Sequence, residues 1–155
     1  MSAQGLELKI PPVAVLLLMA GLMGLGAWAL PSLTFVLPGR AFAAGGLVAA
    51  GIVVTLLGVV SFRRARTTVN PMMPESASTL VIAGIYRWTR NPMYLGMLLI
   101  LSGLACFLSN ALAAALLPVF VLYMTRFQIR PEERALEVRF GPDFVAYKKR
   151  VRRWI

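Results

Sequence analysis

Two polar segments of an otherwise apolar chain hold the side chains that could do chemistry. The first ends with Arg90-Asn91-Pro92-Met93-Tyr94, and the second contains Glu132 and Glu133. Asn91-Pro92 is typical of a helix start, with Asn at the N-cap and Pro at the first helical position. The backbone N–H groups of such a start attract anions, so a ligand carboxylate could bind there beside Arg90. The alternative is a capped helix at a membrane border, with interfacial aromatic rings and snorkelling arginines.

The residue types that are missing exclude several kinds of active site. The chain has no histidine and a single cysteine, Cys106. It therefore has no His-dependent catalytic triad, no HExxH zinc site, no His-ligated haem and no cysteine cluster for zinc or iron–sulfur. We predict no metal site, and we expect Cys106 to be a small hydrophobic side chain in an apolar stretch.

The composition is that of a small, basic membrane protein. Hydrophobic residues make up 59 % of the 155 residues, charged residues make up 14 %, and the net charge is +10. A soluble domain is usually about half apolar and about a quarter charged, and a disordered chain needs low hydrophobicity. Both classes are therefore disfavoured.

The apolar runs predict an all-α membrane domain, residues 1–155, with about four transmembrane helices. The uncharged run 91–125 would reach roughly 50 Å as one helix, against a hydrocarbon core of about 30 Å. Ser109-Asn110 is the only polar pair near its middle, so we predict a helical hairpin with a turn there. The predicted spans are 10–30, 41–62, 92–108 and 111–126. The glycines expected to let helices approach closely are Gly21, Gly24, Gly45, Gly46 and Gly51.

The placement of charge favours four spans over three. With four spans, Arg40 alone of the 16 Lys and Arg residues lies on the far face. The positive-inside rule then places both termini, the 63–91 loop and the 127–155 tail in the cytoplasm. The apolar stretches carry no charged residue, which disfavours a transporter or an ion exchanger.

The tail predicts helices that lie at the membrane surface. Pro131 suits a helix start or a sharp kink, and Glu132 and Glu133 then meet the positive end of the helix dipole. Gly141 predicts a helix stop, and Pro142 predicts the next start. An apolar stripe follows at helical spacing, which predicts an amphipathic helix on anionic lipid: Phe144, Tyr147, Val151 and Trp154. Nucleic acid is not an expected partner, because the charge follows the membrane topology so closely.

The motifs also resemble a known family. The pattern comprises Leu80-Val81, Gly84-Ile85-Tyr86, the segment from Arg90 to Gly96, a hairpin, Glu132-Glu133-x-x-Leu136, Phe140-Gly141 and the stretch from Tyr147 to Trp154. Over roughly residues 65–155 the chain resembles the isoprenylcysteine carboxyl methyltransferases, integral-membrane enzymes related to the phospholipid N-methyltransferases.

This resemblance implies that S-adenosylmethionine (SAM) binds at the cytoplasmic face without a Rossmann domain, and that a lipid-facing opening admits the substrate tail. Asn91 stands where many relatives have histidine. A substrate-contacting arginine of relatives falls by spacing on Gln128, so its neighbours Arg126 and Arg130 become candidates for that role, with Glu133 as a further catalytic candidate. The implied cofactor contacts, with Arg90 beside them, are Ser78, Thr79, Leu80, Val81, Tyr86, Asn91, Pro92, Met93, Tyr94 and Glu132.

The expected function is methyl transfer from SAM to a lipophilic acceptor, leaving S-adenosylhomocysteine. A carboxylate acceptor, as in isoprenylcysteine, needs no general base, because alignment and desolvation suffice. An amine acceptor would have to arrive deprotonated or lose its proton to Glu133 or a tyrosine. Two alternatives stay open: a phospholipid amine N-methyltransferase, and a non-catalytic membrane protein whose basic tail binds anionic lipid or a partner. The oligomeric state is not predicted.

Overall fold

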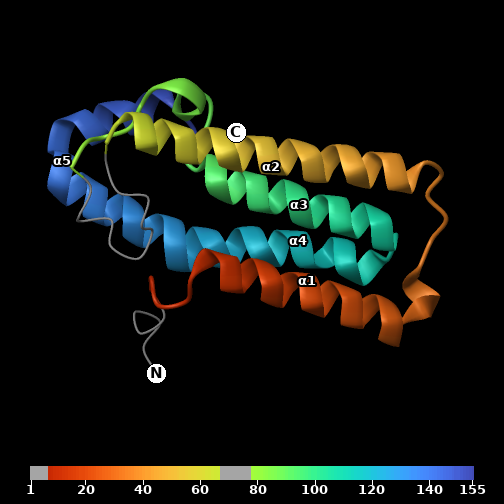
Figure 1. The fold of residues 1–155 in the computed structure, drawn as a ribbon. Coiled ribbons are helices and arrows are strands. Elements are labelled where there is room, and N and C mark those ends of the chain that lie inside the picture. The colour runs from red at the N-terminus through yellow and green to blue at the C-terminus, as the bar shows by residue number, and fades with distance from the viewer. Residues whose placement is uncertain (1–6, 67–77) are drawn as a thin grey trace.

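The computed structural model describes residues 7–66 and 78–155, which form an all-helical bundle (Figure 1). Each apolar range predicted from the sequence corresponds to one of the helices α1 to α4, and α2 extends beyond its predicted range at both ends. A π-helix, η5, joins α4 to α5, and two short 3-10 helices, η2 and η4, lie in connections. The helices are α1 (Pro12–Ala29), η2 (Pro31–Leu33), α2 (Arg40–Arg64), η4 (Gly84–Arg87), α3 (Pro92–Leu108), α4 (Ala111–Met124), η5 (Thr125–Ile129) and α5 (Arg130–Arg150).

Three helical stretches are long and apolar enough to cross a bilayer: α1, α2 and the continuous stretch Ala111–Arg150 that begins with α4. The apolar helix α3 is shorter, with 17 residues. At about 1.5 Å per residue it reaches about 25 Å, close to the thickness of the hydrocarbon core. We therefore describe the chain as a multi-pass membrane protein.

The charged segments gather at one end of the bundle. Figure 1 places the end of α2, the 78–91 segment and α5 together at the left, and the start of α2 at the opposite end. Arg40 begins α2 and is thus separated from the other segments that carry Lys and Arg. This layout agrees with the charge asymmetry of the sequence, and the side that faces the cytoplasm stays a prediction.

Glycines allow α2 and α3 to pack in close contact. A Cβ added at Gly51 would lie 2.6 Å from the Gly96 carbonyl oxygen, and one added at Gly103 would lie 2.9 Å from the Ala44 carbonyl oxygen. Small residues permit such an approach of two backbones. The prediction is confirmed for Gly51. It is wrong for the other four predicted glycines, where an added Cβ would meet nothing within 4 Å: Gly21, Gly24, Gly45 and Gly46.

A buried polar turn closes the hairpin at the far end of the bundle. Ser109 adopts the left-handed conformation (φ 48°) and ends α3, and the Asn110 side chain accepts hydrogen bonds from the first N–H groups of α4. The Asn110 amide also donates to the Leu30 carbonyl, 3.1 Å away, and to the Thr34 hydroxyl, 3.2 Å away. This turn therefore caps a helix and ties the hairpin to the α1–α2 connection.

The passage from α4 to α5 contains no break. α5 begins at Arg130 with Pro131, Glu132 and Glu133 in its first turn, as predicted, and the π-helix η5 joins it directly to α4. Proline lacks the N–H that would bond the carbonyl four residues earlier, which is that of Phe127. The Leu8 N–H donates to that carbonyl instead, at 3.1 Å, and the Gln128 side chain donates to the Ile10 carbonyl at 2.6 Å. The N-terminal segment thus provides hydrogen-bond partners for polar groups of the π-helix.

The tail bends where predicted, but its apolar stripe faces the protein. Gly141 has φ 51° and ψ −125°, and the chain folds back there within α5. Phe144, Tyr147 and Val151 are 2–8 % exposed and pack with three residues of the 80–140 region, Leu80, Leu136 and Phe140. Trp154 packs against the main core. The predicted lipid-facing stripe is therefore wrong, because the tail buries that face on the site instead.

Candidate functional site

The two polar segments meet through Tyr94 and Glu132. Tyr94 lies in the first turn of α3, and Glu132 lies in the first turn of α5. The Tyr94 hydroxyl donates a hydrogen bond to the Glu132 carboxyl group. Burial raises the pKa of Glu132 to about 8, the charge of Glu133 adds to this rise, and the hydrogen bond from Tyr94 opposes it. At neutral pH this carboxyl group is therefore mostly protonated.

Glu133 has a different environment. Arg90 donates to Oε1 of Glu133 at 2.7 Å, and Arg153 donates to both carboxylate oxygens, at 3.0 and 2.6 Å. Although desolvation pushes the pKa of Glu133 upward, the hydrogen bonds from Arg153 and Arg90 outweigh it and hold this pKa below its usual value. Adjacent carboxyl groups thus differ in charge at neutral pH, which is a common way to separate their roles.

Arg90 links the 78–91 segment to the end of α5 and the residues that follow it. Besides its bond to Glu133, its guanidinium donates to the carbonyls of Lys148 at 3.0 Å and Val151 at 2.9 Å. Its Nε is buried and has no hydrogen-bond partner among the described residues. The guanidinium beside the helix start is therefore already engaged by protein groups.

Asn91 occupies the predicted N-cap position without capping the helix. Its side chain makes no cap hydrogen bond to α3. The amide donates instead to the Arg153 carbonyl at 2.9 Å, while the backbone N–H of Asn91 donates to the Thr89 hydroxyl at 3.2 Å. The capping prediction is wrong because a carbonyl from the end of the chain competes for this side chain.

The other predicted cofactor contacts lie in the 78–91 segment and in the first turn of α3. Pro92 and Met93 face α2, since a Cβ added at Gly58 would lie 3.3 and 3.0 Å from their Cγ atoms. Tyr86 is buried, with its ring edge-on to Phe62 at 5.4 Å between centroids. Leu80 is partly buried and Val81 is buried, whereas Ser78 and Thr79 are exposed.

The candidates for acceptor binding do not share one place. Arg126 forms an ion pair with Glu7 at 2.6 Å, and Glu7 also pairs with Arg134. Gln128 is fully buried, and its Oε1 has no hydrogen-bond partner among the described residues. Arg130 is exposed at the start of α5. Arg130 is thus exposed, Arg126 is half-buried and Gln128 is buried.

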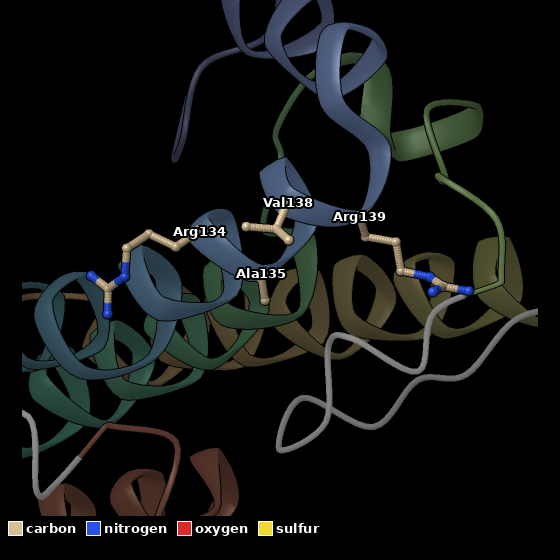
Figure 2. A pocket seen from close by; sticks show the side chains of 4 residues that line it. All are labelled: Arg134, Ala135, Val138 and Arg139. Carbon is tan, nitrogen blue, oxygen red and sulfur yellow. The ribbon is translucent and has the colours of Figure 1, made fainter.

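An open depression lies on the outer face of α5. It is lined by Arg134, Ala135, Val138 and Arg139. In Figure 2 the Arg134 and Arg139 side chains extend in opposite directions with Val138 between them. Val138 is 89 % exposed. None of these residues was predicted for the site.

Three residues that organise the site were missed by sequence reasoning: Glu7, Arg153 and Trp154. The Trp154 indole donates to the Thr125 hydroxyl at 3.2 Å. Glu7 lies 119 positions before Arg126, with which it pairs, and Arg153 lies 20 positions after Glu133. Their charges alone gave no signal of these contacts.

Fold and site together define a helical membrane protein with a polar centre at one end of the bundle, where the starts of α3 and α5 meet. The chain belongs to the phospholipid methyltransferase family, which matches residues 40–143. The match begins with α2, earlier than the resemblance found in the motifs, and it ends before Tyr147. No solved structure matches the chain.

Relatives from three organisms are similar to parts of the chain. A Haemophilus influenzae protein named only as uncharacterized is 44 % identical over 63 residues, which are 41 % of this chain and all of that protein. The protein-S-isoprenylcysteine O-methyltransferase of Saccharomyces cerevisiae is 35 % identical over 80 residues, covering 50 % of this chain and 32 % of the enzyme. The Rattus norvegicus enzyme of the same name is 30 % identical over 112 residues, covering 68 % of this chain and 39 % of the enzyme. The chain thus spans well under half of either named enzyme.

Proposed function

We propose that this chain is an integral-membrane, SAM-dependent methyltransferase that methylates a carboxylate on a lipophilic acceptor, such as an isoprenylcysteine. The observation that carries the proposal is the contact between Tyr94 and Glu132. It joins the two segments that carry the methyltransferase resemblance, at the charged end of the bundle. Membership of the family and the names of the yeast and rat relatives support the same reaction class.

The residues around this contact suit SAM. Glu132 is a buried carboxyl group that an ammonium group would ionise, since an opposite charge nearby favours the charged form. The start of α3 offers backbone N–H groups for a carboxylate, and the 78–94 segment offers apolar and aromatic side chains for an adenine. When bound, SAM supplies a methyl group activated by its sulfonium.

The protein itself then has to align SAM with the acceptor and to exclude water from the site. Glu133 is held ionised by two arginines, which fixes the start of α5 and makes this carboxylate a poor proton acceptor. A carboxylate acceptor fits such a site, because it needs no proton removed. Alignment of two reactants can be worth effective molarities of roughly 10⁵–10⁸ M. Arg130, exposed beside Glu132 and Glu133, is our candidate for orienting the acceptor carboxylate, and Arg126 is the second.

Amine methylation of a phospholipid is the second candidate. The family that matches is named for phospholipids. Glu132 has a pKa of about 8, within the range suited to a general base near neutral pH. For this reaction Glu132 could accept the proton only if the ammonium group of SAM bound elsewhere, and otherwise the amine would have to arrive deprotonated.

A labelling experiment separates these reactions. Purified protein in detergent would receive tritiated SAM with a prenylated cysteine analogue or, separately, with phosphatidylethanolamine, and Glu132→Gln would serve as the control. We expect base-labile, volatile label with the cysteine analogue and none with the control. Stable label in the lipid fraction would instead establish N-methylation. Absence of label with both acceptors would favour a non-catalytic protein whose basic tail binds lipid or a partner.

A further inference from the structure

Residues 151–154, which follow α5, form an extended strap across the site. α5 ends at Arg150, and Val151 has the extended angles φ −122° and ψ 133°. The Arg90 N–H donates to the Arg152 carbonyl at 3.0 Å, and the Asn91 side chain donates to the Arg153 carbonyl at 2.9 Å. The backbone of the strap therefore fixes the segment that leads into α3.

The Arg153 side chain binds the opposite half of the site. Its Nε and Nη2 donate to the two carboxylate oxygens of Glu133, at 3.0 and 2.6 Å. A fork of this kind fixes the orientation of a carboxylate as well as its position. Glu133 is 13 % exposed, so solvent screens this pair only weakly. Arg153 thus connects the α3 segment, through its carbonyl, with the first turn of α5, through its guanidinium.

Trp154 anchors the end of the strap on η5 and the main core. Its indole N–H donates to the hydroxyl of Thr125, the first residue of η5, and its ring packs against the main core. Three separate elements therefore converge on residues 151–154: the loop before α3, the π-helix and the start of α5. All of these strap residues lie beyond residue 143, where the family match ends.

We propose that Arg153 is a positioning residue, which holds Glu133 so that the neighbouring Glu132 faces the start of α3. This inference rests on the proposed function, since the site that it positions is the proposed SAM site. Arg153 itself need not touch the cofactor. Its effect on ligand affinity should depend on the two-pronged contact with Glu133 and not on positive charge alone.

The adjacent arginine provides a matched control. Arg152 is exposed, and Arg152→Ala removes the same charge from the same strap while sparing the Glu133 contact. We would measure the Kd for S-adenosylhomocysteine by calorimetry in detergent for wild type, Arg152→Ala, Arg153→Ala and Arg153→Lys. We expect Arg153→Ala to weaken binding about tenfold and Arg152→Ala to bind like wild type. Arg153→Lys should fall between, because lysine keeps the charge but lacks the planar fork.

The outcomes separate the two proposals. If wild type binds and Arg153→Ala binds as tightly as Arg152→Ala, the positioning role is wrong while the proposed function stands. If Arg153→Ala does not fold, Arg153→Lys decides: binding equal to wild type would overturn the role, and weaker binding by a folded protein would support it. If folded wild type does not bind S-adenosylhomocysteine, the proposed function fails, and the positioning role fails with it.

Discussion

The hydroxyl group of Tyr94 donates a hydrogen bond to the carboxyl group of Glu132, which lies 38 positions later in the chain. Tyr94 is only 4 % exposed and belongs to the main core, so the tyrosine is held rigidly by packing. The contact couples the first turn of α3 to the first turn of α5. A ligand that binds to either residue is therefore expected to affect both segments.

Replacing the ionisable carboxyl group of Glu132 should weaken cofactor binding. Glu132→Gln keeps the size of the side chain but cannot pair with an ammonium group, so the Kd for SAM should rise about tenfold or more. Tyr94→Phe, which keeps the ring in the core, should raise it about threefold to tenfold. Glu137→Gln is the control, because Glu137 lies on the same helix but pairs with Lys148. Equal binding by Glu132→Gln and the control would place the site elsewhere.

Cofactor binding should release a proton. The pKa of Glu132 is raised to about 8 by burial, so the free protein carries this proton at pH 7. Pairing with an ammonium group requires the ionised form, and the Kd should therefore fall as the pH rises toward 8, by up to about tenfold per pH unit. Calorimetry in buffers of different ionisation enthalpy measures the proton directly. Binding that is independent of buffer, or unchanged release in Glu132→Gln, would contradict this assignment.

The same group should affect the stability of the free protein in the opposite direction. The unfolded chain loses this proton near pH 4.5, whereas the folded protein keeps it up to about pH 8. Between these values the folded state binds more protons, so the contribution of Glu132 to stability decreases as the pH rises. Thermal unfolding of wild type and Glu132→Gln across this range measures the difference. The stability of wild type relative to Glu132→Gln should increase as the pH falls from about 8 to 4.5, and a relative stability that stays constant or decreases over this range would contradict the raised pKa.

The contact between α2 and α3 should tolerate no extra methyl group. A Cβ at Gly96 would lie 2.5 Å from the Gly51 carbonyl oxygen, so Gly96→Ala should destabilise the protein by about 1–3 kcal/mol. Gly46→Ala is the matched control in α2, where the added Cβ meets nothing within 4 Å. It should be neutral or stabilising by up to about 1 kcal/mol. Thermal midpoints in detergent measure both, and equal midpoints would contradict the packing.

The turn between α3 and α4 should depend on Asn110. Asn110→Ala removes the cap of α4 and leaves the Leu30 carbonyl and the Thr34 hydroxyl without this donor. We expect a loss of about 2 kcal/mol, because caps are typically worth about 1 kcal/mol and lost buried hydrogen bonds add to it. Ser102→Ala is the control, since that hydroxyl bonds only the Leu98 carbonyl of its own helix in the described part of the chain. A loss of stability no greater than in Ser102→Ala would contradict this role of Asn110.

Strong local signals allowed part of the fold to be predicted. Asn91-Pro92 and Ser109-Asn110 bound α3 at the predicted residues, because proline fixes a helix start and a polar pair breaks an apolar run. Gly141 bends the tail for the same kind of reason, since it adopts φ 51°. Such features depend on residues close together in sequence.

Long-range competition explains what the sequence did not predict. The polar groups of the π-helix are paired with residues more than a hundred positions away: Leu8 donates to the Phe127 carbonyl, and Gln128 donates to the Ile10 carbonyl. No local sequence pattern predicts these contacts. The side chain of Asn91 donates to the Arg153 carbonyl and does not cap α3. The stripe that contains Tyr147 has the spacing of a surface helix, yet the Tyr147 hydroxyl donates to the Tyr86 carbonyl inside the protein. Periodicity identified the apolar face but not the surface that covers it.

Binding of SAM at the Tyr94–Glu132 contact can be measured by a calorimetric titration of SAM into purified, folded wild-type protein and into Glu132→Gln. We expect micromolar binding at one site in wild type, with proton release, and clearly weaker binding without that release in Glu132→Gln. If well-folded wild-type protein did not bind SAM, or if both proteins bound it equally, the proposed site would be wrong.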